Sequence, residues 1–177
     1  MHNFYNKVRA LLMPTIVILG FTTCIPLAAS MDNVRRHHKK MVNVEQVKCL
    51  ATNIFYEARM EPLAGQAAVA RVVVNRVKHG FASTPCKVIY QSNYFDRGND
   101  MKVKVCQFSW VCEKLGKPKE NDPRFKQAMQ IAYDVLAHDK YKEVVPKSTL
   151  FFHATHVSPE WKYKKVKKIG NHIFYSK

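Results

Sequence analysis

The sequence is short of acidic residues. Its 177 residues include 13 Asp and Glu against 29 Lys and Arg, which gives a formal net charge of +16. Such a charge favours association with a polyanion, and the candidates are nucleic acid, anionic lipid and an anionic cell envelope. Internal repeats and low-complexity tracts are also absent, while 47% of the residues are hydrophobic, which excludes wholesale disorder. A chain of this length predicts one folded domain.

The N-terminus has the pattern of a secretory signal. Lys7 and Arg9 precede an apolar stretch over residues 10–27, and small residues follow it. We expect cleavage near Ala29 or Ser30, with a retained membrane anchor as the alternative. Export makes genomic nucleic acid an improbable target and leaves the envelope as the expected polyanion.

The expected organisation has three parts. Residues 1–30 form the signal peptide, residues 31–43 form a basic flexible arm, and residues 44–177 form the folded domain.

The cysteines lack metal-site spacing. No C-x-x-C motif occurs, and Cys49, Cys86, Cys106 and Cys112 are separated by 37, 20 and 6 positions. An even number of cysteines in an exported domain predicts two disulfides, whose three possible pairings stay open. A Cys/His metal site and four buried free thiols are the alternatives.

Hydrophobic periodicity predicts three helices. The first begins after Asn43, a candidate N-cap with Gln46 in the capping-box position, and stops near Met60. The second has Pro62 in its first turn and ends at Gly80. The third follows Asp122 as its cap.

The remaining segments favour loops and strands. Residues 81–121 show no sustained period and predict a long loop-rich section. The C-terminal part predicts strands over residues 149–153, 164–169 and 172–175, with a Gly170-Asn171 turn before the last.

Glu57 is the first candidate for chemistry. A carboxyl group near the end of an apolar helix is partly desolvated, which raises its pKa and suits a general acid. The alternative is an ordinary surface carboxylate paired with Arg59 or Lys48. Glu61 is a candidate second carboxylate, although a Glu before Pro at a helix start is more often a cap or a dipole partner.

The second half contains further candidates. His153 and His156 have the spacing of a metal pair, but the sequence does not identify a third ligand. Aromatic residues are frequent there, and some of them are suited to stacking on sugar rings.

Several blocks of the sequence resemble one known family. They lie in order within residues 44–175, which makes the set more specific than any single motif. The blocks are Cys49-Leu50-Ala51-Thr52-Asn53-Ile54-Phe55-Tyr56-Glu57-Ala58-Arg59-Met60-Glu61-Pro62, Gly65-Gln66-Ala67-Ala68-Val69-Ala70, Val73-Val74-Asn75-Arg76-Val77, Cys106-Gln107-Phe108-Ser109-Trp110, Phe151-Phe152-His153-Ala154-Thr155-His156-Val157-Ser158-Pro159-Glu160-Trp161 and Ile169-Gly170-Asn171-His172-Ile173-Phe174-Tyr175. Together they resemble the SleB-like cell wall hydrolases, related to spore cortex-lytic enzymes. Met60 departs from the glycine usual in the family.

The resemblance implies a fold and an activity. The fold is a lysozyme-like α+β domain, helix-rich in its first half, with a small sheet or hairpin in its C-terminal part. The activity is cleavage of peptidoglycan between N-acetylmuramic acid and N-acetylglucosamine, as a lytic transglycosylase with Glu57 as the catalytic acid. One carboxylate then suffices; if a second is needed, Glu61 is the first candidate and Asp96 the next. The candidate groove residues are Gln66, Tyr94, Gln107, Ser109, His153 and Tyr175.

The expected setting and partners follow from the same resemblance. We expect a secreted, periplasmic or envelope-located monomer that needs no cofactor or metal. Its partners are peptidoglycan and anionic envelope polymers, with no nucleic acid and only transient contact with the membrane through the signal. Bacterial and phage origins stay open, as do hydrolase and transglycosylase products. Two other classes also stay open: a zinc amidase or peptidase using His153, His156 or His172, and a non-catalytic envelope-binding module.

Overall fold

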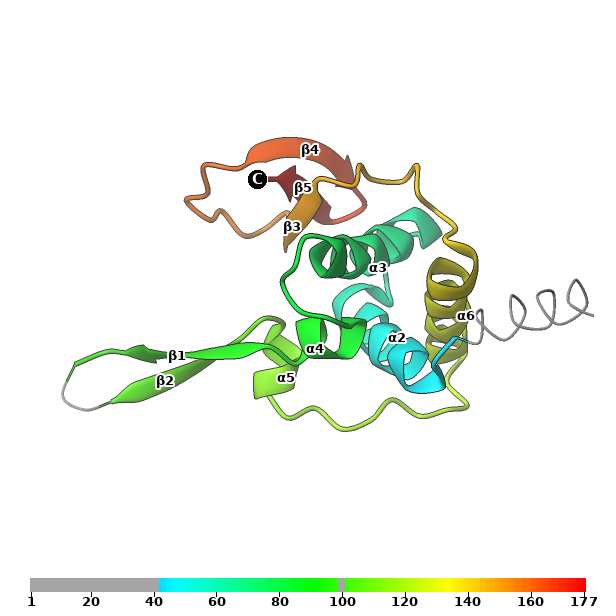
Figure 1. Cartoon of the computed structure of the whole chain (residues 1–177), viewed down its shortest axis with the longest axis horizontal. Helices are drawn as coiled ribbons and strands as arrows, with labels where there is room; N and C mark the ends of the chain where they lie inside the picture. The colour runs from blue at the N-terminus through cyan, green and yellow to red at the C-terminus, as the bar shows by residue number, and fades with distance from the viewer. Residues whose placement is uncertain (1–41, 99–100) are drawn as a thin grey trace, which may run out of the picture. The chain divides into compact units, whose positions relative to one another are not determined.

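Three helices form the main body of the fold. They are α2 (Val44–Ala58), α3 (Leu63–Lys78) and α6 (Pro123–His138), and each contacts the other two (Figure 1). The computed structural model describes residues 42–98 and 101–177, all of them within a compact unit of residues 38–177. The expected signal peptide and almost all of the basic arm lie outside the described residues. The three predicted helices are confirmed.

The N-terminus of α2 confirms one predicted cap and corrects another. Asn43 Oδ1 accepts hydrogen bonds from the backbone N–H groups of Glu45 and Gln46, at 2.8 and 3.4 Å. The predicted capping box is wrong, because Gln46 Oε1 accepts from the backbone N–H of Cys86 at 3.0 Å instead. The Gln46 side chain therefore joins α2 to the next part of the chain.

The corner between α2 and α3 is short. Helix α2 ends at Ala58, and Pro62 is the N-cap of α3, one position outside the predicted first turn. Met60 is 78% exposed and does not have a positive φ, so this corner does not require the glycine usual in the family. Helix α3 ends before Gly80, whose φ of 78° suits a glycine stop.

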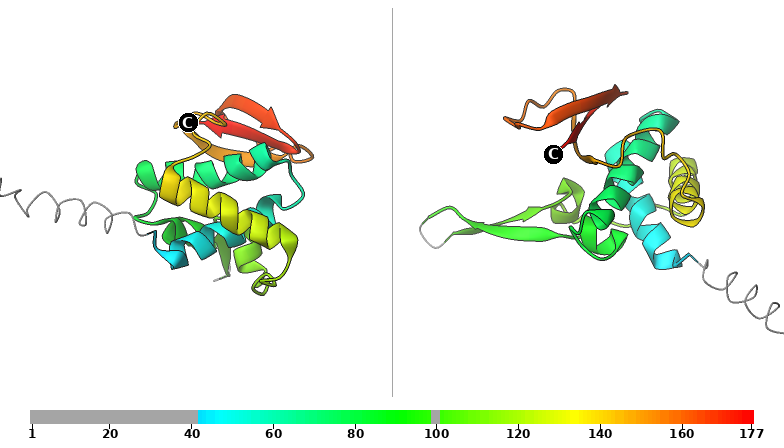
Figure 2. Two further views of the ribbon diagram at one scale, coloured as in Figure 1. Left: turned by 90° about the vertical axis from the view of Figure 1, so that its right-hand side faces the viewer. Right: turned by 45° about the horizontal axis from the view of Figure 1, so that its top comes forward.

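Residues 81–121 hold more regular structure than predicted. They contain the short helices α4 (Pro85–Ile89) and α5 (Ser109–Cys112) and an antiparallel hairpin of β1 (Ser92–Asp96) and β2 (Lys102–Cys106). None of these elements exceeds five residues, which is too short to produce a hydrophobic period. The hairpin extends away from the three helices, and its strand β2 contacts α5 (Figures 1 and 2).

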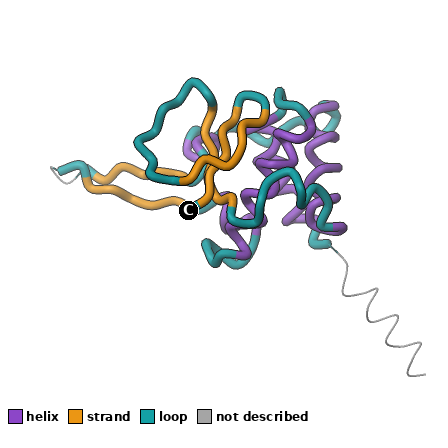
Figure 3. Tube along the Cα trace, turned by 90° about the horizontal axis from the view of Figure 1, so that it is seen from above, coloured by secondary structure: helices purple, strands orange, loops and turns teal. Residues whose placement is uncertain are grey.

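The predicted C-terminal strands are confirmed and form one sheet. They are β3 (Thr149–Ala154), β4 (Lys164–Ile169) and β5 (His172–Ser176), in the antiparallel order β3-β5-β4. The turn between β4 and β5 contains Gly170 at a φ of 56°. Strand β3 packs on α3, and the strands gather on one side of the helices (Figure 3).

Apolar side chains from all three long helices make the core. The largest cluster joins Leu50 and Ile54 of α2, Val73 of α3 and Ile131 of α6, each at most 2% exposed. A second cluster joins α3 to the sheet through Phe174, which is fully buried. Within the described ranges, no helix is both long enough and apolar enough to cross a membrane.

Both predicted disulfides are present, and the structure resolves their pairing. Cys49 of α2 pairs with Cys86 of α4, and Cys106 of β2 pairs with Cys112 of α5. The first crosslinks positions 37 apart and the second positions 6 apart. The first therefore restricts the unfolded chain more.

Removing the two disulfides should have unequal costs. Chain entropy predicts that Cys49→Ala/Cys86→Ala lowers the free energy of unfolding by about 4 kcal/mol and Cys106→Ala/Cys112→Ala by about 2 kcal/mol. Urea denaturation of the two double variants and the parent measures both differences. A larger loss from the Cys106–Cys112 pair would show that it has a role in the folded state beyond closing a short loop.

Candidate active site

Glu57 lies in the last turn of α2, between the core and solvent. Ile54 and Ala58 beside it are buried, and Glu57 itself is half-buried. Within the described chain, its carboxylate has no hydrogen-bond or ion-pair partner. The alternative of a surface ion pair fails, because Lys48 lies 3.8 Å from Glu120 and Arg59 donates to the carbonyl of Phe55.

The surroundings of Glu57 favour its protonated form. Burial raises the pKa of Glu57 to about 7; the positive charge of Arg76 opposes this rise, and the negative charge of Glu113 adds to it. At neutral pH the group is therefore present in both protonation states. A carboxyl group in this condition can donate a proton and later accept one.

Arg76 of α3 is held rigidly beside this carboxyl. It is 4% exposed, and its Nε donates to the carbonyl of Leu150 at 2.7 Å. Its guanidinium lies 5.4–5.7 Å from the ring centroids of Phe81, Phe108 and Phe151. Burial lowers the pKa of Arg76 to about 10 and the charge of Glu57 opposes this, so the side chain stays cationic at neutral pH.

Glu61 is tied to the sheet. Its two carboxylate oxygens accept from the backbone N–H and the side-chain amide of Asn171, at 2.8 and 3.2 Å. Gly170 lies against the same carboxylate, and a Cβ on Gly170 would be 1.9 Å from Glu61 Oε2. The carboxylate joins the α2–α3 corner to the β4–β5 turn, an arrangement that favours a structural role.

Gln66 belongs to the same corner. It is 3% exposed, and its side-chain amide donates to the carbonyl of Glu61 at 2.9 Å. Its Oε1 is buried and has no partner among the described residues. Gln66 therefore stabilises the α2–α3 corner from within the protein. It lies close in sequence to Glu57 and Glu61.

His153 and Tyr175 contact each other on neighbouring strands of the sheet. His153 Nδ1 donates to the carbonyl of Ala154 at 2.9 Å, so in the neutral ring Nε2 accepts from the Tyr175 hydroxyl, also at 2.9 Å. Trp161, which is 41% exposed, packs against the edges of both rings. The three form a partly exposed aromatic surface with polar edges, the chemistry that sugar rings bind.

The other candidate histidines make no hydrogen bond to this pair in the described part of the chain. His156 is exposed in the turn after β3, and His172 is 7% exposed with its ring against Phe152. Over the described part of the chain, no three His, Cys, Asp or Glu side chains gather as metal ligands.

The remaining candidates divide between α5 and the hairpin. Gln107 is half-buried just before α5, Ser109 is exposed at its start, and Trp110 beside them donates to Asn53 Oδ1 of α2 at 3.0 Å. Tyr94 is 66% exposed on β1, away from the helical core, and Asp96 Oδ1 accepts from the backbone N–H of Gly98. The structure thus groups Glu57, Glu61 and Gln66 at the helix corner and His153 with Tyr175 on the sheet, while Tyr94 lies on the projecting hairpin.

Sequence reasoning missed two charged neighbours of Glu57, Arg76 and Glu113. Arg76 belongs to one of the recognised blocks, but an Arg in an Ala- and Val-rich helix gives no sign of which side it faces. Glu113 follows α5, a helix too short to be predicted. A buried position among the core-facing valines of α3 was the available signal for Arg76.

Comparison with known proteins identifies the family. The family model for cell wall hydrolases matches residues 60–175. The chain belongs to the cell wall hydrolase family. The matched range begins after Glu57, so the case for that residue rests on its surroundings. No curated protein matches the chain.

Solved structures show the fold of this cell wall hydrolase. The catalytic domain of the Bacillus cereus SleB protein is 24% identical with a TM-score of 0.53, covering 76% of this chain and 91% of its own. The catalytic domain of the germination-specific lytic transglycosylase SleB from Bacillus anthracis is also 24% identical with a TM-score of 0.53, covering 77% of this chain and 98% of its own. The expected α+β architecture, helical first and with strands at the C-terminus, is confirmed as the SleB catalytic-domain fold.

The charged neighbours of Glu57 in this cell wall hydrolase predict opposite pKa changes. Glu113→Gln removes a negative charge and should lower the pKa of Glu57, whereas Arg76→Gln removes a positive charge and should raise it. Titration of the glutamate carboxyl carbons by ¹³C NMR measures both shifts, with Glu120→Gln as a remote control. Equal pKa values in the parent and Glu113→Gln would show that the charge of Glu113 does not affect the pKa of Glu57.

The link between Glu61 and Asn171 predicts a loss of stability. Glu61→Ala leaves two donors of Asn171 without their acceptor and should lower the free energy of unfolding by about 2 kcal/mol. Gly170→Ala should also destabilise, because the added methyl group meets the same carboxylate. Urea denaturation measures both, with Glu120→Ala as the control. Loss of wall cleavage at parental stability in Glu61→Ala would instead support a catalytic role.

Proposed function

We propose that this protein cleaves the glycan strand of peptidoglycan between N-acetylmuramic acid and N-acetylglucosamine, as a lytic transglycosylase in wall remodelling or lysis. The observation that supports this most is Glu57, a half-buried carboxyl group with a pKa of about 7, no hydrogen-bond partner within the described structure and a buried cation nearby. Family membership makes the cell wall the substrate. The SleB catalytic domain from Bacillus anthracis, which shares this fold, belongs to a germination-specific lytic transglycosylase.

Glu57 performs both proton transfers in the proposed reaction. The protonated carboxyl donates its proton to the glycosidic oxygen as the bond to the muramic acid C1 breaks and an oxocarbenium-like state develops. The carboxylate then takes the proton of the muramic acid 6-hydroxyl, whose oxygen attacks C1. The products are a 1,6-anhydro end and a free hydroxyl on the leaving sugar. The carboxyl ends the cycle protonated again.

This route suits the surroundings of Glu57 because it needs one carboxylate. Two-carboxylate glycosidases need a nucleophile or a base that activates water. Glu61, the nearest candidate in sequence, is occupied by Asn171. Asp96, the next candidate, lies on the projecting hairpin. An intramolecular hydroxyl removes the need for either.

The aromatic surface of the sheet is the proposed sugar-binding region. Trp161 presents an exposed ring, and the His153–Tyr175 pair supplies polar edges beside it. Gln107 and Ser109 at α5, Gln66 at the corner and Tyr94 on the hairpin complete the proposed groove set. The two disulfides are consistent with a location outside the cytoplasm, where such bonds persist. Anionic polymers of the envelope are proposed partners of the basic surface.

Glu57→Gln tests the catalytic assignment. The amide keeps the shape of the side chain and cannot donate the proton, so muropeptide release from purified sacculi should fall by a factor of about 10² to 10⁴. Glu120→Gln, an exposed change of the same chemistry, should keep the parental rate. A folded Glu57→Gln protein that releases muropeptides at the parental rate would refute the assignment.

Mass spectrometry of the same products tests the reaction type. A transglycosylase leaves 1,6-anhydromuramic acid ends, whereas a hydrolase leaves reducing ends. Reducing ends alone would retain Glu57 as the acid but replace the 6-hydroxyl with water.

A further inference from the structure

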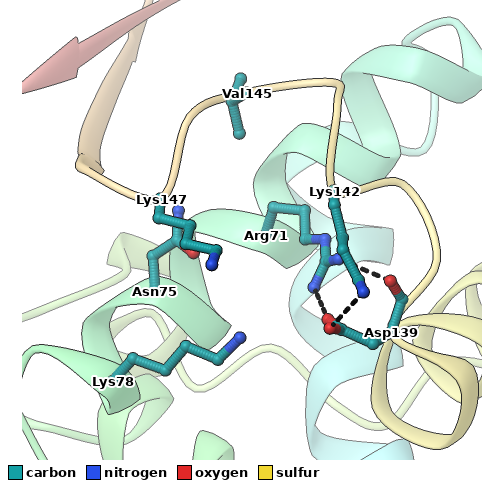
Figure 4. Close-up of a pocket in the computed structure, with 7 residues that line it drawn as sticks. All are labelled: Arg71, Asn75, Lys78, Asp139, Lys142, Val145 and Lys147. Carbon is teal, nitrogen blue, oxygen red and sulfur yellow. Dashed lines mark hydrogen bonds and ion pairs between the residues drawn. The ribbon is translucent and has the colours of Figure 1, made fainter.

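A small pocket beside α3, separate from the surroundings of Glu57, is lined mainly by basic side chains. Arg71 and Lys78 come from α3, and Lys142 and Lys147 come from the connection between α6 and β3 (Figure 4). Asp139, directly after α6, is the one acidic residue among the residues that line the pocket. Neither Arg76 nor Glu113, the charged neighbours of Glu57, lines it. The pocket therefore does not belong to the proposed active site.

Asp139 is already occupied within the pocket. Its carboxylate accepts from Arg71 Nη1 at 2.6 Å and from Lys142 Nζ at 3.0 Å, and its carbonyl accepts from Arg71 Nη2 at 2.8 Å. Burial would raise the pKa of Asp139, but these hydrogen bonds and the charges of Arg71 and Lys78 lower it to about 2. One negative charge thus faces four positive ones, which leaves the pocket cationic.

The pocket also contains an unsatisfied donor. Arg71 is 3% exposed, yet its Nε has no hydrogen-bond partner among the described residues. A buried N–H of this kind is costly unless an acceptor reaches it. In Figure 4 the Arg71 side chain turns toward Asp139 with Lys142 beside it, and Asn75, Lys78 and Lys147 lie on the other side of the pocket. Lys78 and Lys147 flank this space and have no ion pair within residues 42–98 and 101–177.

We propose that this pocket binds a phosphate group. Arg71 supplies a rigid cation at the bottom of the pocket. Lys78 and Lys147 supply mobile cations at its mouth. A phosphate monoester carries nearly two negative charges and several acceptor oxygens, which matches the charge of the pocket better than a carboxylate does. The pocket is small and open to solvent, so the proposed phosphate binds at its mouth and the rest of the carrier stays in solvent.

The surface beside the pocket favours a phosphate carried on a polymer. Val145 lines the pocket, and Lys167 of β4 donates to the carbonyl of the adjacent Val144 at 3.4 Å. Strand β4 also carries the exposed Lys164, Lys165 and Lys168, at the edge of the sheet. The register of β4 with β5 shifts between Lys165 and Lys167. Successive phosphates along a polymer would meet these lysines beyond the pocket.

Phosphate titration of the full-length protein tests the site. Amide shifts of Lys78 and Val145 are followed by ¹⁵N NMR against sodium chloride at equal ionic strength. We expect saturation at millimolar phosphate in the parent and at least tenfold weaker binding in Lys78→Gln/Lys147→Gln. The double variant keeps Arg71, whose removal would leave Asp139 with Lys142 as its remaining ion-pair partner. Lys119→Gln/Lys126→Gln, with the same loss of charge at exposed positions outside the pocket, should bind as the parent does.

The outcomes separate a site from general charge attraction. Shifts that do not saturate, or equal binding by Lys78→Gln/Lys147→Gln and the parent, would overturn the proposal. A second titration with a poly(glycerol phosphate) of defined length identifies the source of the group. Tighter binding per phosphate indicates a polymer ligand, and equal binding indicates the free ion. No glycan is cleaved in either experiment, so the result is independent of the function proposed for Glu57.

Discussion

Burial of the middle of α3 is the constraint on which the rest of the structure depends. Helix α2, helix α6 and the sheet each pack against it, and residues 67–70 as well as Val72 and Val73 are fully inaccessible to solvent. A helix surrounded in this way has no polar face to turn to water. Its buried polar side chains therefore need partners inside the protein.

The polar residues of α3 meet this requirement by holding the other elements in place. Asn75 donates to the carbonyls of Pro146 and Thr149, and Arg76 donates to that of Leu150, so both connect α3 to the start of β3. Arg71 donates to the carboxylate of Asp139 just after α6, and Gln66 donates to the carbonyl of Glu61 in the α2–α3 corner. The small residues of α3 allow the close approach that these bonds require. The hydrogen bond to Leu150 also keeps Arg76 rigid. Its fixed positive charge near Glu57 influences the pKa of the carboxyl without any movement of the side chain.

Local patterns predicted the helices and the C-terminal strands, because each extends far enough to show its period or its caps. Asn43 and Asp122 cap helices as predicted, and the α2 pattern placed Glu57 at the edge of the core. Contacts between distant segments were not predictable in this way. The partners of Glu61 lie 110 positions away, and the pairing of Cys49 with Cys86 depends on a helix of five residues. Arg76 was missed because periodicity shows that a position is buried but does not show which charge lies next to it.

Two arginines on α3 each lower the pKa of a nearby carboxyl group, yet the two carboxyl groups end with very different pKa values. Arg71 donates directly to Asp139, and the pKa of that carboxyl falls to about 2 despite burial. Arg76 donates a hydrogen bond from Nε to the Leu150 carbonyl, and its guanidinium lies near three aromatic rings. It makes no hydrogen bond to Glu57 in the described structure, so it affects that carboxyl through charge alone. Burial then dominates, and the pKa of Glu57 rises to about 7. A direct hydrogen bond between Arg76 and Glu57 would hold the carboxyl ionised, as Arg71 holds Asp139, and leave it no proton to donate. Because no hydrogen bond joins Arg76 to Glu57 among the described residues, the carboxyl keeps the raised pKa that its proposed role as an acid requires.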